Sequence, residues 1–312
     1  MAERILLSLG NLNPRRWFEL LSGHREVVLE PDGPEDPSIR FAVVWKYPHG
    51  SLKHLPNLQG IFSMGAGVDH IMADPDLPRV PVVRVVDENL TQHMVEYVVW
   101  RVMDHHRQGA AYRAQQARGV WHEPPQRTAG DVSVGIMGLG QLGRAAAEAV
   151  RSLGFSVNGW SRSPRDVPGV HTFHGENQLV QFLNTTDILV VLLPLTPQTR
   201  GIVNSGLLRQ LRQRNALGGA VLINAGRGAL QSDADIFQAL EDGTLKEASL
   251  DVFEEEPLPA SSPLWTHPRL FLTPHAAATS DPNHLVGPML EGMARIERGE
   301  TPDNLVNRAA GY

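Results

Sequence analysis

The sequence predicts an α/β protein with two Rossmann-like domains, each built on a doubly wound parallel sheet. Three observations lead to this prediction. Short apolar runs alternate with helical patterns along most of the chain. A glycine-rich turn, residues 138–143, stands between one such run and a strong helix former. The 312 residues, 42% of them hydrophobic, suffice for two separate cores.

Composition excludes several functional classes. The formal net charge of −6 gives no general reason to expect a nucleic acid or an anionic membrane as partner. The chain has no cysteine, which excludes disulfides, thiolate metal sites and a cysteine nucleophile. Met1–Leu7 resembles a first strand rather than a signal peptide, and no window approaches 18 uninterrupted apolar residues. We therefore expect a soluble cytoplasmic protein.

The first part of the chain reads as a small α/β unit. Its expected strands are the apolar runs at residues 5–9, 27–29, 41–45, 58–63 and 82–86, and residues 17–21 are helical. A long helical pattern, Gln92–Gln108, follows this unit. The last helical pattern, His284–Arg298, comes after the final strand of the second unit, so we expect it to return to the first.

The alternation of strand and helix resumes at Val132, after a polar stretch, Gly119–Gly130, that carries an exposed-looking Trp121. The expected strands lie at residues 132–137, 156–160, 188–193, 220–224, 248–252 and 270–273. Six strands are the number that a doubly wound dinucleotide-binding domain needs.

The turn after the first of these strands is G-x-G-x-x-G in the strand–turn–helix setting that dinucleotide binding requires. Gly138 permits a tight turn, Gly140 lets the backbone approach a pyrophosphate, and Gly143 lets helix and strand pack closely. The diphosphate would bind free N–H groups at the positive end of the helix. The alternative is a purely structural glycine-rich turn.

The end of the second strand indicates which dinucleotide binds. An NAD-preferring site places an acid here to accept a hydrogen bond from the ribose 2′-hydroxyl. This chain instead has Ser161, eighteen residues after Gly143, followed by Arg162 and Arg165. One hydroxyl and two guanidinium groups suit a phosphate dianion, which favours NADP(H), with NAD(H) binding more weakly. The alternative is a solvated basic turn.

Four stretches follow predicted strands, at the edge of the sheet where ligands bind. They are Leu193–Pro197, Asn224–Gly228, Asp251–Pro259 and Thr273–Ala276. Together they supply Arg227, Glu256 and His275, a set that fits hydride transfer to a 2-oxo acid. Arg227 can polarise the carbonyl, His275 can donate the proton, and Glu256 can orient the imidazole.

The motifs GLGQLG, NAGRGAL, DVFEEEPLP, TPHAA and GAGVDH resemble those of the D-2-hydroxyacid dehydrogenase family along nearly the whole chain. Within the family, VWKYP, MGAGVDH, WSRSPR, SPLWTHP and the Gly311-Tyr312 end resemble its short glyoxylate/hydroxypyruvate reductase A group. The resemblance implies an NADPH-dependent reductase that converts glyoxylate to glycolate and hydroxypyruvate to D-glycerate.

The resemblance also implies an organisation. Residues 1–95 and 285–312 would form a flavodoxin-like substrate lobe, with the nucleotide domain, residues 96–284, inserted and a cleft that closes on substrate. The N–H groups of Ala66 and Gly67 would hold the substrate carboxylate, with Trp45 as a wall, and Arg227, Glu256 and His275 would be catalytic. An arm at about residues 100–130, carrying Trp121, would join a homodimer. The expected cofactor contacts are Gly138, Leu139, Gly140, Gln141, Leu142, Gly143, Ser161, Arg162, Ser163, Arg165, Leu193, Pro194, Thr199, Ala225, Gly226 and Asp251.

Several residues have structural alternatives. Glu254 or Glu255 competes with Glu256 as the histidine's partner, but the motif places the acid directly before Pro-Leu-Pro. Arg227 could instead form a surface ion pair, and residues 65–67 could be a plain turn. Trp45 could be a core residue and Asp251 an ordinary residue at the end of a strand. The pairs His105/His106 and His171/His174 lack metal-binding spacing, so we expect surface histidines and no metal site.

Rival functions share the fold. A 3-phosphoglycerate dehydrogenase usually carries a C-terminal regulatory domain, for which this chain ends too soon, and formate dehydrogenase relatives pair the histidine with Gln rather than Glu. A dinucleotide-sensing corepressor of the same fold is the alternative from another class. It would bind the cofactor without turnover.

Overall fold

The computed structural model describes residues 4–84 and 87–311 and divides the chain into two compact units. The first comprises Met1–Leu90 and Thr279–Tyr312, and the second comprises Thr91–Ala278. The boundaries expected from the sequence, near residues 95 and 285, lie a few residues further along the chain. The end of the expected strand at 82–86 and the terminal Tyr312 fall outside the described residues.

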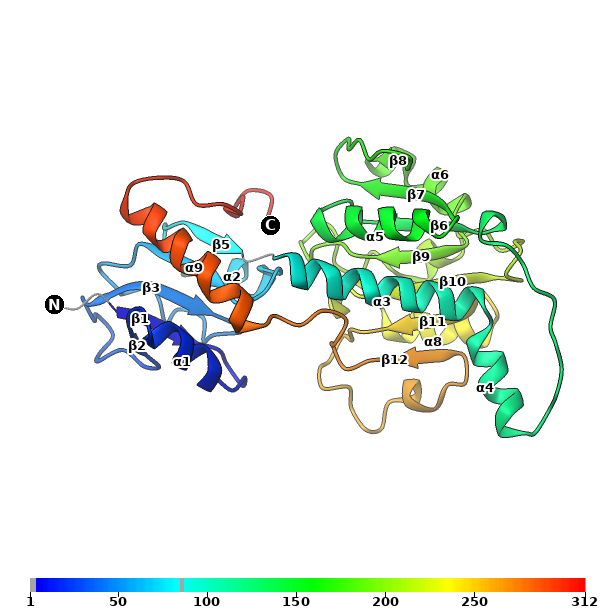
Figure 1. Ribbon diagram of the computed structural model, residues 1–312, viewed down its shortest axis with the longest axis horizontal. Helices are drawn as coiled ribbons and strands as arrows, with labels where there is room; N and C mark the ends of the chain where they lie inside the picture. Colours follow the sequence, from blue (N-terminus) through cyan, green and yellow to red (C-terminus); the bar gives the residue numbers. More distant parts are fainter. Residues whose placement is uncertain (1–3, 85–86, 312) are drawn as a thin grey trace. The chain divides into compact units, whose positions relative to one another are not determined.

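The first unit is built on a five-stranded parallel sheet with the order β2-β1-β3-β4-β5, which is the flavodoxin-like order (Figure 1). Its central strands are almost entirely buried, because helices and loops cover both faces of such a sheet. The strands are β1 (Arg4–Ser8), β2 (Glu26–Val28), β3 (Ile39–Val44), β4 (Gly60–Ser63) and β5 (Val82–Arg84).

The late helix α9 (Pro282–Glu297) belongs to this first unit, where the sequence predicts it. It lies beside α1 (Arg15–Ser22), and Leu285, Met289 and Met293 enter the same core as β1, β3 and β4. Arg25, which precedes β2, forms an ion pair with Glu297 at the end of α9, 2.6 Å between Nη1 and Oε1. A short helix, α2 (Asp69–Met72), follows β4.

The second unit contains a seven-stranded parallel sheet with the order β12-β11-β10-β9-β6-β7-β8. This is the doubly wound dinucleotide-binding order with one further strand. The prediction of six strands was one short: it missed β8, whose sequence HTFH buries only Phe173 and so shows no apolar run. The strands are β6 (Ser133–Met137), β7 (Ser156–Ser161), β8 (His171–His174), β9 (Ile188–Val191), β10 (Ala220–Asn224), β11 (Leu245–Leu250) and β12 (Leu270–Leu272).

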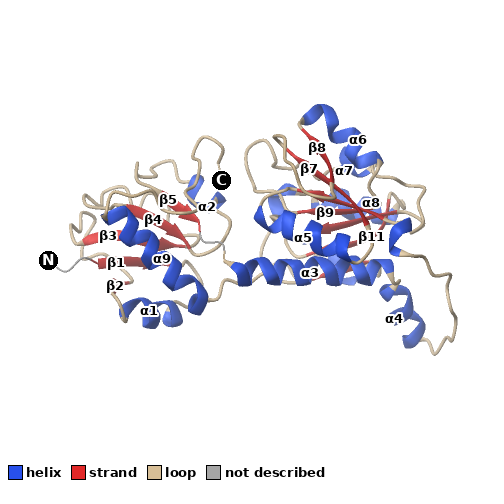
Figure 2. Ribbon diagram, turned by 45° about the horizontal axis from the view of Figure 1, so that its top comes forward, coloured by secondary structure: helices blue, strands red, loops and turns tan. Residues whose placement is uncertain are grey.

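Helices cover both faces of this sheet (Figure 2). One core lies beneath α3 (Glu88–His106) and α5 (Gln141–Ser152). The other lies beneath α6 (Leu179–Asn184), α7 (Ser205–Leu208) and α8 (Asp233–Glu241). The helix α4 (Gly109–Ala117) begins the arm. Short 3-10 helices occupy Ala129–Asp131, Glu176–Gln178, Gly228–Leu230 and Pro263–Thr266. In residues 4–84 and 87–311, no helix has the length and apolarity needed to span a bilayer.

The expectation of surface histidines was wrong for His105 and His106, which are 4% and 5% exposed at the end of α3. His105 lies against β11, with Nδ1 2.6 Å from Glu247 Oε2 and Nε2 2.7 Å from Ser249 Oγ. The last turn of α3 is therefore fastened to the sheet by polar contacts that no local pattern indicates. His171 and His174 are exposed. No cluster of metal-binding side chains occurs in the described part of the chain.

Candidate active site

The glycine-rich turn has the geometry that each of its glycines predicts. Gly138 has a φ of +114°, and a Cβ there would lie 2.7 Å from the Leu192 carbonyl oxygen. A Cβ on Gly143 would lie 1.8 Å from the Gly138 oxygen, so only glycine lets α5 approach the turn this closely. At Gly140, by contrast, an added Cβ meets no atom within 4 Å. The open space beside Gly140 leaves the backbone accessible to a ligand.

The N-terminus of α5 offers hydrogen-bond donors at the same place. Gly140 is the N-cap and supplies no side-chain cap. Among the described residues, none accepts a hydrogen bond from the N–H groups of Gly140, Gln141 or Leu142. The first N–H groups of a helix lack partners within the helix and carry its positive dipole. These residues therefore fit a cofactor diphosphate.

The turn after β7 carries the charges expected for the ribose end of a phosphorylated dinucleotide. Arg162, Ser163 and Arg165 are exposed. Ser161 is only 8% exposed, and its hydroxyl donates to the Ser163 carbonyl oxygen at 2.8 Å. The two guanidinium groups are thus the accessible positive charges of this turn, whereas Ser161 shapes its backbone.

The loop after β9 is held by the hydroxyl of Thr199. This oxygen accepts from the Thr196 N–H at 2.8 Å and donates to the Pro194 carbonyl at 2.7 Å. Leu193 is buried at the base of the loop, and Pro194 is partly exposed. The side chain of Thr199 therefore fixes the backbone that would face a cofactor.

Arg227 lies in a turn that is shaped by a residue the sequence reading missed. The fully buried Asn224 accepts from the Gly226 N–H through Oδ1 at 3.0 Å, and its Nδ2 donates to Gln231 Oε1 at 2.7 Å. Arg227 itself is partly exposed and donates from Nη1 to the Gly226 carbonyl at 2.8 Å. Ala225 is buried beside this turn. An Asn at the end of a strand, before a glycine turn, is the only local signal for this role.

The two glycines beside Arg227 do not open its backbone to a ligand. A Cβ on Gly228 would lie 1.7 Å from the Phe253 carbonyl oxygen, and one on Gly226 would lie 2.9 Å from Leu230 Cδ1. Both spaces are filled by protein. Gly228 is needed because the Arg227 turn lies directly against the loop that follows β11, whereas Gly226 faces Leu230 and the Leu193 carbonyl.

That loop places Glu256 against His275. Glu256 Oε2 lies 2.9 Å from His275 Nδ1, and Oε1 accepts from the Phe253 N–H at 3.2 Å. Glu254 instead accepts from the N–H of Asp233, at 2.7 Å. Burial raises the pKa of Asp233, and the charges of Glu254 and Glu256 raise it further. Glu256 is therefore the carboxylate that orients the imidazole. This contact occupies Nδ1, so Nε2 is the ring nitrogen that could donate to a ligand.

The backbone of His275 has an uncommon conformation, which a hydrogen bond to Asp251 stabilises. Its φ is +55°, and its N–H donates to the Asp251 carbonyl at 2.8 Å. Asp251 is 1% exposed, and its carboxylate accepts from Thr273 Oγ1 at 2.6 Å and from the N–H groups of Ala276 and Ala277 at 2.8 and 3.0 Å. Asp251 thus fastens the turn that presents His275. Its expected contact with the cofactor stays a prediction.

Tyr97 on α3 extends this support. Its hydroxyl lies 2.9 Å from Thr273 Oγ1, whose own hydrogen is donated to Asp251, so Tyr97 is the donor of the pair. Burial raises the pKa of Tyr97 to about 12, which keeps the phenol protonated. The sequence gives no indication of this contact, because the two residues lie 176 positions apart.

The first unit carries the residues expected to bind a carboxylate. Ala66 and Gly67 are partly exposed in the turn between β4 and α2. Ser63 Oγ donates to the Gly67 carbonyl at 3.0 Å. In the described chain no acceptor is found for the N–H of Ala66 or Gly67, so both can donate to an anion. Trp45, just after β3, is partly buried. Thus Arg227, Glu256 and His275 lie in the second unit, whereas Ala66, Gly67 and Trp45 lie in the first.

Comparisons with known proteins identify relatives of this chain. Residues 99–277 match the family model described as D-isomer specific 2-hydroxyacid dehydrogenase, NAD binding domain. A glyoxylate/hydroxypyruvate reductase A of Salmonella paratyphi B is 40% identical over 294 residues, which cover 92% of this chain and 91% of that protein.

Two solved structures are similar over almost their whole length. An NADPH-dependent glyoxylate/hydroxypyruvate reductase of Sinorhizobium meliloti, in complex with NADP and sulfate, has a TM-score of 0.93 and 43% identity, covering 99% of this chain and 100% of that one. A D-isomer specific 2-hydroxyacid dehydrogenase of Xanthobacter autotrophicus Py2, in complex with NADPH and MES, has a TM-score of 0.92 and 39% identity, covering 100% of both chains.

Proposed function

Because the chain belongs to the D-isomer specific 2-hydroxyacid dehydrogenase family, we propose that it is an NADPH-dependent reductase of small 2-oxo acids. Its substrates are glyoxylate, reduced to glycolate, and hydroxypyruvate, reduced to D-glycerate. The observation that carries the proposal is the Glu256–His275 pair, 2.9 Å between Oε2 and Nδ1, at the edge of the sheet that also bears Arg227. Relatives named glyoxylate/hydroxypyruvate reductase A support the choice of substrates.

In this proposal the chain binds the 2-oxo acid and supplies the proton. The Arg227 guanidinium contacts the carboxylate and the carbonyl oxygen and stabilises the negative charge that develops there. Protonated His275 donates from Nε2 to that oxygen, which becomes the hydroxyl of the product. Glu256 holds the imidazole through Nδ1–H and stabilises its charged form. The N–H groups of Ala66 and Gly67 bind the carboxylate. NADPH, when bound, supplies the hydride.

We assign the cofactor's diphosphate and its ribose 2′-phosphate to two places on the second unit. The N–H groups at the start of α5 bind the diphosphate beside Gly140. Arg162 and Arg165 bind the ribose 2′-phosphate, because they are the exposed charges of the turn after β7. Ser161 contributes less, since its hydroxyl hydrogen is donated to Ser163. Solved relatives that contain NADP or NADPH support this choice of cofactor.

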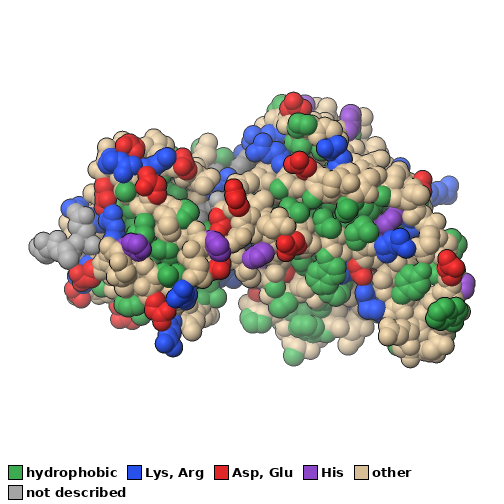
Figure 3. All heavy atoms as spheres, in the orientation of Figure 1, with side chains coloured by type: hydrophobic (Ala, Val, Ile, Leu, Met, Phe, Trp, Pro, Cys, Tyr) green, Lys and Arg blue, Asp and Glu red, His purple; other side chains and the backbone are tan. Residues whose placement is uncertain are grey.

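A homodimer joined through the arm is part of the same proposal. Figure 3 shows hydrophobic side chains gathered on the face of the second unit that bears α3. Trp100 on α3 and Tyr112 on α4 are 49% and 38% exposed, and Trp121 in the following segment is 103% exposed. A second copy covering these side chains would remove a large apolar area from water. A cytoplasmic location also stays a prediction.

Initial rates test the proposal. Glyoxylate and hydroxypyruvate are each assayed with NADPH and with NADH. We expect rapid oxidation of NADPH and a much lower kcat/KM with NADH. Turnover with NADH alone would contradict the 2′-phosphate site but keep the reductase. Tight NADPH binding without turnover on any 2-oxo acid would contradict the reductase and favour a dinucleotide sensor.

A further inference from the structure

The indole of Trp45 is confined on the side of the turn that carries Ala66 and Gly67. A Cβ added to Gly65 would lie 3.0 Å from Trp45 Cζ3 and 3.5 Å from its Cη2. The missing side chain of Gly65 is therefore what lets the edge of the ring approach this turn. The backbone of Trp45 is fixed as well, because its N–H donates to the Ser8 carbonyl at 2.9 Å. The next residue, Lys46, has a φ of +43°, so the chain bends away sharply after the indole.

A second ring holds the indole. The imidazole of His70 has its centroid 4.6 Å from that of Trp45, with the ring planes inclined by 57°. This separation is typical of aromatic pairs in direct contact. His70 belongs to α2, which is anchored by the fully buried Ile71. Its carbonyl lies 3.0 Å from His49 Nε2. The helix that carries the imidazole is therefore anchored in the core of the first unit.

We propose that His70 is a positioning residue for substrate selection: it holds the Trp45 indole beside Ala66 and Gly67, and the held indole excludes 2-oxo acids with large substituents. This inference rests on the proposed function, in which the N–H groups of these two residues bind the carboxylate. The substituent on the carbonyl carbon lies a few bonds from that carboxylate. A fixed indole leaves room for hydrogen or hydroxymethyl, whereas a released one makes room for a bulky group.

The test compares glyoxylate, hydroxypyruvate and phenylpyruvate at saturating NADPH. Wild-type turnover of glyoxylate is measured first, because its absence would contradict the proposed function and not the role of His70. In His70→Ala we expect the kcat/KM ratio of phenylpyruvate to glyoxylate to rise roughly tenfold, with the KM for NADPH unchanged. His70→Phe keeps a ring against the indole and should keep the wild-type ratio.

A variant cycle separates positioning from a general structural role. Trp45→Ala alone should shift the ratio at least as far as His70→Ala. Adding His70→Ala to Trp45→Ala should then change the ratio no further, because His70 acts only through the indole. An unchanged ratio in His70→Ala, an equal loss for all three acids, or a shifted ratio in His70→Phe would each overturn the proposal. Should His70→Ala fail to fold, His70→Leu takes its place in the cycle.

Discussion

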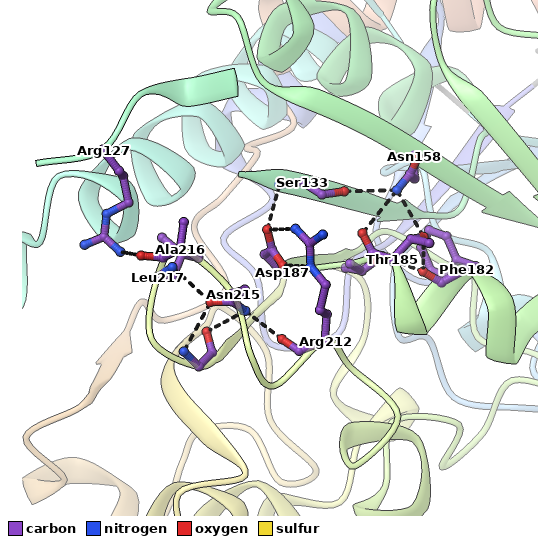
Figure 4. Close-up of polar contacts among 12 residues, drawn as sticks. Arg127, Ser133, Asn158, Phe182, Thr185, Asp187, Arg212, Asn215, Ala216 and Leu217 are labelled. Atoms are coloured by element: carbon purple, nitrogen blue, oxygen red, sulfur yellow. Dashed lines mark hydrogen bonds and ion pairs between the residues drawn. The ribbon is translucent and has the colours of Figure 1, made fainter. Parts of the chain in front are cut away.

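Polar side chains have opposite roles at the two ends of the strands in the seven-stranded sheet of the second unit. We call the side where the strands begin the amino edge and the side where they finish the carboxyl edge. At the amino edge, Asp187 is 0% exposed and both of its oxygens are engaged by the Arg212 guanidinium and the Ser133 N–H. Figure 4 shows these groups facing one another between β6 and β9. At the carboxyl edge, His275 keeps 34% of its side chain exposed and a φ of +55°. The polar side chains at the amino edge bind other groups of the protein, whereas at the carboxyl edge a titratable side chain is accessible to solvent.

The amino edge extends this closure through side-chain amides. Asn158 Nδ2 donates to Ser133 Oγ at 3.0 Å, and Asn215 Nδ2 donates to the Gly219 carbonyl at 3.1 Å (Figure 4). Polar groups whose partners are all within the protein stabilise the fold and offer nothing to a ligand. The comparison predicts that substitutions at the carboxyl edge lower activity and that substitutions at the amino edge lower stability.

The largest effect should come from His275→Ala. We expect kcat to fall roughly 10²–10⁴-fold, because the proton donor is lost, while NADPH binds nearly as in the wild type. The midpoint of urea unfolding should change little, since the imidazole is partly exposed. His171→Ala, an exposed histidine on β8, serves as the matched control and should leave kcat unchanged. Near-normal turnover in His275→Ala would remove this residue from its role.

Asp187→Ala should show the opposite profile. We expect it to lower the free energy of unfolding by about 2–3 kcal/mol, because the Ser133 N–H loses its partner inside the protein. This loss of stability is smaller than that expected for a fully buried ion pair, because 40% of the Arg212 side chain is exposed and can be hydrated. Urea unfolding followed by circular dichroism measures the change, and kcat per folded molecule should stay near the wild-type value.

A double variant sharpens this prediction. Arg212→Ala alone leaves a buried carboxylate without its cation, and the added Asp187→Ala removes that uncompensated charge. The double variant should therefore lose less stability than the sum of the single losses. Additive losses would show that the two side chains do not stabilise each other.

The sequence predicted local geometry better than it predicted the side chains that hold this geometry in place. The structure contains the expected tight turn at residues 138–143 and the expected contact between Glu256 and His275, while their roles in binding and catalysis stay predictions. Asn224, Tyr97 and the contacts of Asp251 with the turn that carries His275 were not predicted. Their partners are backbone groups or side chains that only the folded chain brings near, so no local spacing reports them.

The same limit explains the two errors in the fold. The strand β8 lies at the edge of its sheet and needs only one buried side chain, Phe173, so it has no apolar pattern. His105 and His106 end a long helix, where a polar pair usually faces solvent. Here Glu247 and Ser249 on β11 contact the imidazole of His105. The imidazole of His106 packs edge-to-face against Phe155, with 5.0 Å between the ring centroids.

Arg227→Lys tests the carboxyl edge with a smaller change. The charge is kept, but the two-pronged contact with carboxylate and carbonyl is lost. We expect kcat/KM for glyoxylate to fall roughly 10- to 100-fold, the loss of about one charge-assisted hydrogen bond. The exposed Arg200, also changed to Lys, is the matched control. Equal kinetics in the two variants would contradict the assignment of Arg227.

The smallest effect separates ligand binding from packing within one turn. Gly140→Ala adds a methyl group where no atom lies within 4 Å, so the free energy of unfolding should change by less than about 1 kcal/mol. The same methyl would intrude on the bound diphosphate, and we expect the Kd for NADPH to rise roughly tenfold, equivalent to about 1.4 kcal/mol. Gly143→Ala is the matched control, because its methyl would lie 1.8 Å from the Gly138 oxygen and must weaken the fold itself. Unchanged NADPH affinity in Gly140→Ala, measured by titration calorimetry, would mean that the diphosphate does not lie against this residue.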